Sequence, residues 1–533
     1  MESMFDHSVE KRLARLTDSG QGDLLRGAQM GVEKESLRVS PDGKLVQTPH
    51  PAGLGSPLTH PQITTDYSEA LAEFITPPLQ GVEAILDQLR DVQRFVYSEL
   101  ENDELLWATS MPCVVAGESS IPIAQYGDSN LGQMKTVYRR GLGHRYGRLM
   151  QVIAGVHFNY SLPEAFWPVF QQLEGDRRPL QDFISDRYFG LIRNLQRLGW
   201  LVPYLFGASP AVCKSFLSGQ PTQLVEFDRY TAYQPYATSL RMGDIGYQNN
   251  QEAETGVKAD YTSLDTYVDS LIRAITTPCP RYERIGVFVN GRWEQLNANL
   301  LQIENEYYST IRPKQLTGPT EMPALALRRR GVRYVELRSL DVNAYDPLGI
   351  CEGQLRFLEA LLITCLLGDS PPIAADERSD IDNNELRAAQ RGRQPDLQLR
   401  RHGKDVGLRE WGEAVMDSMQ GVCELLDAIQ HTQAYGRALA NQREKLADPE
   451  LTPSARMLAE MRANGEGFFH FAMRMSLQHR EHFLSLPLCP RREAEFRRMT
   501  ADSRQRQAEI EAADDKSFAV YLRDYFGQLS ADA

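Results

Sequence analysis

Apolar and polar residues alternate in several short runs within the first two thirds of the chain, a period of two that is typical of β-strands. Strands are predicted at 31–39, 152–162, 284–290, 300–311 and 332–342. Residues 81–100 instead carry apolar side chains at helical spacing, at positions Ile85, Leu86, Leu89, Val92, Val96 and Leu100. Helices separate some of the strands, but no regular repeat of strand and helix occurs. We therefore predict an α+β fold with a largely antiparallel sheet.

The pattern becomes helical after residue 352, where one helix face gathers Leu355, Leu358, Leu361, Leu362 and Cys365. Residues 368–403 are rich in charge, proline and asparagine, and are interpreted as a long surface connection. Beyond it, a helix is predicted to begin at Pro453, with Thr452 as its N-cap and Gly465 near its end. We predict a strand-bearing domain over 1–370 and a helical C-terminal region over 371–533.

Composition and charge exclude several classes of protein. Hydrophobic residues make up 42% and charged residues 24% of the 533 positions, as in globular proteins. The formal net charge of −13 argues against general binding to nucleic acids or anionic membranes. The 7 cysteines form no CxxC motif, which favours a reduced, cytoplasmic chain over a disulfide framework. No leader is expected, because the opening segment MESMFDHSVEKRLARL contains no apolar run. No membrane span is expected, because the most apolar stretch is only about twelve residues long.

The segment GVEKESLR, residues 31–38, places two acids two positions apart in a predicted strand. Alternate side chains of a strand share a face, so Glu33 and Glu35 are expected to lie together, opposite Val32 and Lys34. A solvated edge strand would explain this pattern. Half of a cation site would explain it as well, provided that further acids come from elsewhere in the chain.

Three other segments offer such groups. The segment 63–78 carries Asp66, Glu69 and Glu73, which would share one side if its middle portion were helical. The strand predicted at 332–342 places Glu336 and Arg338 on one face, and the strand predicted at 152–162 carries His157. An exposed helix face would also explain the three acids of the first segment. A structural salt bridge would explain Glu336 with Arg338, and a hydrogen-bonded core histidine would explain His157. Together the segments provide mainly oxygen ligands and one imidazole, which suggests a magnesium-nucleotide site.

Arginines and tyrosines complete the candidate chemistry. Forked donors for phosphate or carboxylate oxygens are available at Arg38, Arg139, Arg140, Arg241 and Arg338. Aromatic residues lie near them in the sequence, at Tyr138, Tyr247, Tyr307 and Tyr308. Surface arginines paired with acids are the alternative explanation. No GxxxxGK[ST] loop, GxGxxG turn or GxSxG elbow occurs, so nucleotide binding would depend on carboxylates and magnesium.

Ten separated segments, taken in order, resemble the γ-proteobacterial type of glutamate–cysteine ligase. The segments are GVEKESLR, LTHPQITTDYSEALAEFITP, SMPC, AQYG.SN, VYRRGL..RYG, GVHFNYSLP, PYLFGASPA, PYATSLRMGDIGY, LQIENEYY..IRPK and VRYVELRSLDVN. They cover nearly all of residues 20–350. Beyond that range the resemblance consists of helical, charged character and the segment LTPSARML.

The resemblance implies a glutamine synthetase-like catalytic domain over residues 1–370, with a curved antiparallel sheet, flanking helices and a helical C-terminal extension. It implies ATP-dependent joining of the L-glutamate γ-carboxyl to the L-cysteine amine through γ-glutamyl phosphate, the first step of glutathione synthesis. We expect the metal to be Mg²⁺ or Mn²⁺ and the chain to be a monomer. The residues that match the family's metal ligands are Glu33, Glu35, Asp66, Glu73, His157 and Glu336. Those that match its substrate pocket are Tyr138, Arg139, Gln151, Arg241, Tyr247 and Tyr308, and Arg338 matches its phosphoryl contact.

Three other functions remain open at this point. A related ligase would join glutamate to a different amine. A phosphagen-type phosphotransferase would stop at a phosphorylated product. A non-catalytic metal-binding module would keep the acids without turning over ATP.

Overall fold

Strand β1 (Gln29–Val39) lies at the centre of an antiparallel sheet. The computed structural model describes residues 4–112, 114–217, 222–246 and 258–531. Within this part of the chain, seven strands form one sheet in the order β11-β12-β5-β1-β3-β2, with β4 paired to β1 beside that path. The strands of this sheet are β2 (Ile63–Thr65), β3 (Leu71–Ile75), β4 (Leu105–Leu106), β5 (Gly155–Ser161), β11 (Ile311–Lys314) and β12 (Tyr334–Asp341), together with β1.

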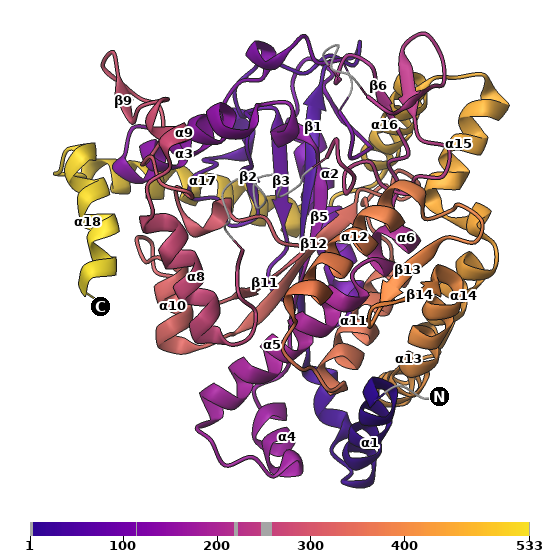
Figure 1. Cartoon of the computed structure of the whole chain (residues 1–533). Helices are drawn as coiled ribbons and strands as arrows, with labels where there is room; N and C mark the ends of the chain where they lie inside the picture. The colour runs from indigo at the N-terminus through magenta and orange to yellow at the C-terminus, as the bar shows by residue number, and fades with distance from the viewer. Residues whose placement is uncertain (1–3, 113, 218–221, 247–257, 532–533) are drawn as a thin grey trace.

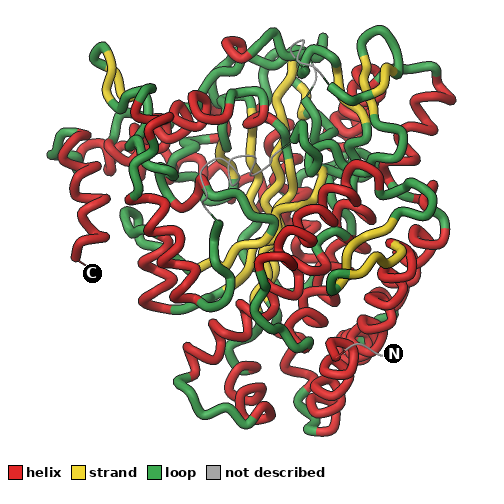
Figure 2. The backbone as a smooth tube through the Cα atoms, in the orientation of Figure 1, coloured by secondary structure: helices red, strands yellow, loops and turns green. Residues whose placement is uncertain are grey.

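Smaller sheets and many helices surround this central sheet (Figure 2). The smaller sheets contain β6 (Ala211–Cys213), β7 (Val225–Glu226), β8 (Thr231–Tyr233), β9 (Phe288–Val289), β10 (Arg292–Trp293), β13 (Gln398–Arg401) and β14 (Lys404–Gly407). The helices of the first two thirds of the chain are α1 (Met4–Asp18), α2 (Val82–Glu99), α3 (Asn130–Tyr146), α4 (Phe166–Glu174), α5 (Leu180–Leu198), α6 (Leu201–Phe206), α8 (Leu264–Thr276), α9 (Pro280–Glu283) and α10 (Pro323–Arg330). The later helices are α11 (Glu352–Leu367), α12 (Ala375–Arg391), α13 (Leu408–Gln430), α14 (Ala434–Ala447), α15 (Pro453–Asn464), α16 (Phe468–Ser485), α17 (Pro490–Ala512) and α18 (Phe518–Ala531). The predicted α+β class with an antiparallel sheet is confirmed.

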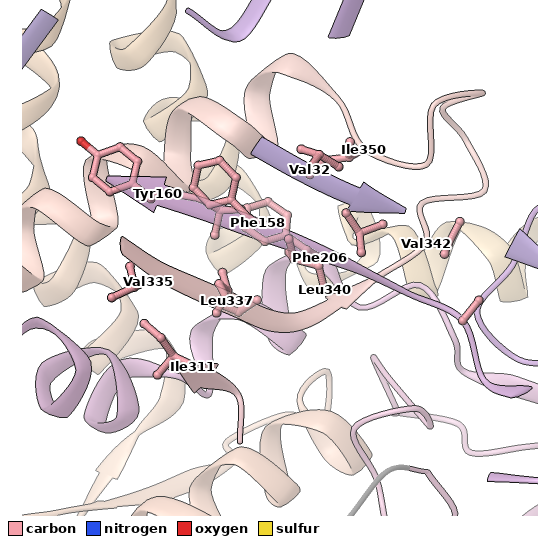
Figure 3. Close-up of a cluster of buried hydrophobic side chains, with 14 of the residues drawn as sticks. Val32, Phe158, Tyr160, Phe206, Ile311, Val335, Leu337, Leu340, Val342 and Ile350 are labelled. Carbon is pink, nitrogen blue, oxygen red and sulfur yellow. The ribbon is translucent and has the colours of Figure 1, made fainter. Parts of the chain in front are cut away.

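One face of the central sheet is apolar and fully buried. Val32, Phe158 and Leu337 come from three neighbouring strands and are at most 1% exposed (Figure 3). Helix α11 packs in this region against α5, α13 and α14, and all its residues from Gln354 to Leu367 are buried. A helix that is buried on every side explains why its apolar residues extend well beyond the single stripe predicted from the sequence.

The opposite face carries the polar partners of these residues, because alternate side chains of a strand point to opposite sides. Strands β1, β5 and β12 were predicted from this alternation and are confirmed. The ladder between β12 and β5 shifts register between Leu337 and Leu340, a bulge that contains Arg338. A bulge bends the strand and re-aims the side chains that it carries.

Three sequence predictions about local structure are wrong. Residues 63–75 form the β2–β3 hairpin and have no helical middle. Residues 300–311 contain a short 3₁₀ turn at Glu304–Glu306, with only Ile311 belonging to a strand. The segment 368–403, interpreted as a surface connection, contains helix α12 and strand β13, the first strand of the β13–β14 hairpin.

The C-terminal helices pack on the strand-bearing part of the chain. Helix α13 contacts α1 and α11, α17 contacts α2, and α18 contacts α3 on the opposite side of the molecule from α13 and α14 (Figure 1). Helix α15 begins and ends as predicted: the side chain of Thr452 accepts a hydrogen bond from the Ala455 amide, and Gly465 ends the helix at φ +62°. A domain boundary at residue 370 remains a prediction.

Two further observations concern the membrane and the thiols. None of the helices within the described residues is both long enough and apolar enough to span a bilayer. Cys213 is disulfide-bonded, so the expectation of a fully reduced chain is wrong at this residue. Free thiols are present at Cys279, Cys351, Cys365, Cys423 and Cys489.

Candidate active site

A cavity of about 650 Å³ lies on the polar face of the central sheet. Its walls include all six predicted metal ligands, namely Glu33, Glu35, Asp66, Glu73, His157 and Glu336. Strands β1, β3, β5 and β12 provide five of these side chains, and the loop between β2 and β3 provides Asp66. A cavity of this size is typical of sites for small molecules and cofactors.

The register of the sheet brings these side chains together. Glu33 pairs directly with His157 across β1 and β5, and Glu35 pairs with Glu73 across β1 and β3. Glu336 pairs with Asn159, two residues beyond His157 on the same face of β5. Four neighbouring strands therefore present one row of acids with an imidazole inside it. This arrangement supports the interpretation of GVEKESLR as part of a cation site.

The imidazole of His157 lies between the carboxylates. Its Nδ1 is 3.2 Å from Glu33 Oε2 and 3.7 Å from Glu336 Oε1, and its Nε2 is 3.6 Å from Glu35 Oε1. Ligand atoms of Glu33, His157 and Glu336 all lie within 4.8 Å of one another, so one metal ion could contact all three. Asn159 donates a hydrogen bond of 2.9 Å to Glu33 Oε1 and orients that carboxylate.

The acids of this row differ in the direction in which their surroundings shift the pKa. Burial and the negative charges of Glu33, Asp66 and Glu35 raise the pKa of Glu73 well above its ordinary value. Burial opposes ionisation of Glu336, but Lys314 and Arg338 outweigh it and hold the pKa of Glu336 well below that value. A bound cation would relieve the repulsion that Glu73 experiences.

Two predicted arginines border the acids. Nη1 of Arg338 donates to Glu336 Oε1 at 2.9 Å, and its Nε is buried without a hydrogen-bond partner among the described residues. The Arg139 guanidinium lies 4.5 Å from the centre of the Tyr126 ring and donates to the backbone carbonyl of Asp66. Both arginines line the cavity.

The residues predicted to bind substrate do not all line the cavity. Tyr138, Gln151 and Tyr308 line the cavity. Burial raises the pKa of Tyr308 to about 12, so its phenol is protonated at neutral pH and can donate a hydrogen bond. Arg241 is buried behind the lining residues, where its Nη2 donates to the Arg338 carbonyl at 2.9 Å. Tyr247 lies outside the described residues.

Two other residues singled out from the sequence have structural surroundings. Arg38 is only 1% exposed, and its guanidinium binds Glu104 at 2.7 Å and donates to the backbone carbonyls of Thr48, Pro49 and Glu69. Glu69 accepts hydrogen bonds of 2.6 Å from two backbone amides, those of His50 and Gln125. Neither side chain lines the cavity, so Arg38 is wrong as a candidate for phosphate binding.

The cavity also contains residues that the sequence did not single out. They include Lys135, Tyr146, Glu306, Arg312, Lys314, Tyr521 and Tyr525. Lys314 lies two residues after Arg312 on β11, and this period of two was a usable signal for a shared face. No comparable signal existed for Tyr521 and Tyr525 on α18, because only the fold brings that helix to the cavity.

Comparison with known proteins places the chain in a family. Residues 13–388, well over half of the chain, match the family described as glutamate-cysteine ligase. The chain is 50% identical to the glutamate–cysteine ligase of Alcanivorax borkumensis, over 97% of this chain and 99% of that protein. It is 49% identical to the glutamate–cysteine ligase of Pseudomonas aeruginosa strain PAO1, over 97% of each chain.

Solved structures agree with this assignment. The crystal structure of glutamate–cysteine ligase from Francisella tularensis in complex with AMP matches with a TM-score of 0.89 and 34% identity, over 95% of this chain and 99% of that one. A bifunctional glutathione synthetase from Pasteurella multocida shares the fold, with a TM-score of 0.71 and 23% identity over 88% of this chain and 54% of that one. By the extent of the family match and the identity over nearly its full length, the chain belongs to the glutamate–cysteine ligase family.

Proposed function

We propose that the acidic cavity is the active site in which this family member joins glutamate to cysteine. As a glutamate–cysteine ligase, the chain makes γ-glutamylcysteine with the cleavage of ATP. The observation that carries the assignment of the site is the row formed by Glu33, His157 and Glu336, with Arg338 beside it, on one wall of the cavity. Such a row suits the phosphates of a nucleotide, because cations held by carboxylates balance phosphate charge.

The donor set fits a hard divalent cation. Glu33, His157 and Glu336 offer converging ligand atoms, and the carboxylates of Glu35, Asp66 and Glu73 line the same cavity. Carboxylate oxygens dominate this set, as Mg²⁺ prefers, and the single imidazole is compatible with Mn²⁺ as well. When bound, such ions neutralise phosphate oxygens and help to orient them for transfer. AMP is bound in the Francisella tularensis structure, which supports a nucleotide in the proposed site.

The reaction that follows from this arrangement has two steps. The γ-carboxylate of glutamate attacks the terminal phosphorus of ATP, a P–O bond forms, and ADP leaves. The amine of cysteine then attacks the resulting acyl phosphate, a C–N bond forms, and phosphate leaves as the amine gives up its proton. Activation is needed because an ionised carboxylate has no good leaving group.

The protein's own side chains would act on the charges that develop. Arg338 presents N–H donors beside the row of acids, where they can stabilise the phosphoryl oxygens during transfer. Arg139, Tyr138, Gln151 and Tyr308 line the cavity and would hold the amino acid substrates through their carboxylate and ammonium groups. Arg241 would support this wall through the Arg338 carbonyl, and a role for Tyr247 rests on the resemblance of its segment alone.

At the level of fold, we propose that the central sheet is the curved catalytic sheet of a glutamine synthetase-like domain. The antiparallel strand order, the bulge in β12 and the position of the acids on one face support this. We also propose that the chain is active as a monomer, since the acids and arginines proposed here all come from one chain. Sedimentation analysis of the active enzyme would test the monomer.

The identity of the products tests the proposed function. ATP, Mg²⁺, glutamate and a panel of amines that includes cysteine would be incubated with the protein and analysed by mass spectrometry. We expect γ-glutamylcysteine, ADP and phosphate, with phosphate release that requires both amino acids. Joining of another amine while cysteine stays unconsumed would contradict the acceptor, and a stable phosphorylated product without ligation would indicate a phosphotransferase.

A further inference from the structure

Lys314 is a cavity residue whose ammonium group contacts one of the proposed metal ligands. It is the last residue of β11, opposite Tyr334 of β12, and its backbone carbonyl accepts a hydrogen bond of 2.8 Å from the Arg333 amide. The backbone of Lys314 is therefore fixed. Its Nζ lies 3.0 Å from Glu336 Oε2, and 29% of its side chain is exposed, against 1% for Glu336.

The contact between Lys314 and Glu336 is an ion pair without hydrogen-bond geometry. Within the part of the chain that the structure describes, Oε2 of Glu336 accepts no hydrogen bond, although the ammonium is 3.0 Å away. Oε1 of the same carboxylate accepts from Arg338. One oxygen of Glu336 is therefore oriented by an arginine, while the other accepts no hydrogen bond among the described residues and faces the charge of a flexible side chain.

A divalent cation bound by Glu336 would contact the same carboxylate as the Lys314 ammonium. The carboxylate of Glu336 belongs to the group with Glu33 and His157 that could hold a metal ion. An ammonium within ion-pair distance of that carboxylate repels a second cation, so the two compete for it. The four-carbon stem of lysine allows the ammonium to move away while the strand stays in place.

The surroundings indicate where the displaced ammonium can go. The segment after β11 lines the cavity with Thr317, Gly318 and Pro319. Glu321, the nearby acid of this segment, is already bound at 2.6 Å by Arg330. Its charge is therefore balanced, and it offers Lys314 a poor alternative partner. Phosphate oxygens that enter the cavity are negatively charged and would form an ion pair with the displaced ammonium.

We propose that Lys314 exchanges partners during the catalytic cycle: it balances Glu336 in the metal-free enzyme and contacts the phosphates of the nucleotide once a divalent cation occupies that carboxylate. This proposal rests on the proposed function, because it assumes that the cavity binds metal and nucleotide. It makes Lys314 both a competitor of the metal and a ligand of the nucleotide. Loss of its charge should therefore change the two affinities in opposite directions.

Equilibrium binding tests this without turnover. Mn²⁺ affinity is measured by titration in the absence of nucleotide, and ADP affinity is measured by calorimetry at saturating Mn²⁺. For Lys314→Met we expect Mn²⁺ to bind at least about fivefold more tightly and ADP at least about fivefold more weakly, a coupling at the lower end of common values. Lys314→Arg keeps the charge and should restore most of the ADP affinity. Lys214→Met serves as the control, because Lys214 forms an ion pair with the exposed Glu226 and does not line the cavity.

Different results contradict different proposals. Unchanged or weaker Mn²⁺ binding by Lys314→Met, or unchanged ADP binding, would overturn the exchange of partners. Lys314→Gln is measured alongside, so that poor folding of the methionine variant does not decide the outcome. If the wild-type protein bound neither Mn²⁺ nor ADP, the proposed active site itself would be wrong, and the exchange would fall with it.

Discussion

Replacement of Arg338 by lysine separates a catalytic arginine from one that only stabilises the sheet. In the structure, one N–H of Arg338 binds Glu336 at 2.9 Å and the buried Nε has no hydrogen-bond partner among the described residues. Lysine can restore the ion pair with Glu336 but cannot present the second, planar edge of a guanidinium. The variant should therefore keep most of the ground-state contact and lose a donor to the moving phosphoryl group.

The expected loss follows from the value of one such donor. A single donor to a transition state contributes up to about 4 kcal/mol, and each 1.4 kcal/mol is about tenfold in rate. We expect Arg338→Lys to lower kcat by about tenfold to a thousandfold, with much smaller changes in the apparent KM for ATP and cysteine. The measurement is kcat from coupled detection of ADP, with the melting temperature determined on the same preparation.

The alternative is that Arg338 only stabilises the sheet, and Arg333 provides a control. Arg333→Lys changes an exposed ion pair with Glu164 just before the same strand, and should leave both kcat and melting temperature nearly unchanged. If Arg338 only stabilised the sheet, Arg338→Lys would melt early and still turn over normally per folded molecule. That combination would refute the catalytic role.

Three further predictions concern the metal site, a buried acid and a close contact. Glu33→Gln should weaken Mg²⁺-dependent turnover, with partial recovery at raised Mg²⁺, because the amide keeps the shape but loses the charge; near-normal activity at ordinary Mg²⁺ would remove Glu33 from the site. Burial, only partly offset by the hydrogen bond from Tyr435, raises the pKa of Glu359 to about 7. A glutamate in the unfolded chain has a pKa of about 4.3, so the free energy of unfolding of the wild type, relative to that of Glu359→Gln, should be greatest below this pH. It should fall by about 3–4 kcal/mol as the pH rises to 7. A difference in unfolding free energy that calorimetry finds to be independent of pH would contradict the shift. Gly155→Ala would place a Cβ 2.2 Å from Nη2 of the buried Arg241, and we expect a loss of about 1–3 kcal/mol in stability, which an unchanged melting temperature would disprove.

The alternation of side chains predicted the strands that matter most for the site. It placed Glu33 with Glu35, and Glu336 with Arg338, on shared faces, and all four line the cavity. The helical interpretation of residues 63–78 failed because alanine, leucine and glutamate favour helices in isolation. Pairing of β3 with β1 and β2 overrides that local preference.

The remaining errors have separate causes. Helix α12 was hidden by its charge, although its buried Ile381, Asn384, Ala388 and Ala389 follow helical spacing and were a usable signal. The approach of α18 to the cavity, and the burial of Arg38 against Glu104, depend on contacts between segments far apart in the sequence. Local patterns carry no information about such contacts.

The strand order of the central sheet has a consequence for how the enzyme folds. Glu33 on β1 and Glu336 on β12 are separated by β5 alone in the sheet but by about 300 positions in the chain, so a long loop must close before they meet. No early, local intermediate can hold these two carboxylates together. During refolding, we therefore expect metal affinity to appear late, after most secondary structure, and metal ions to slow unfolding much more than they accelerate folding.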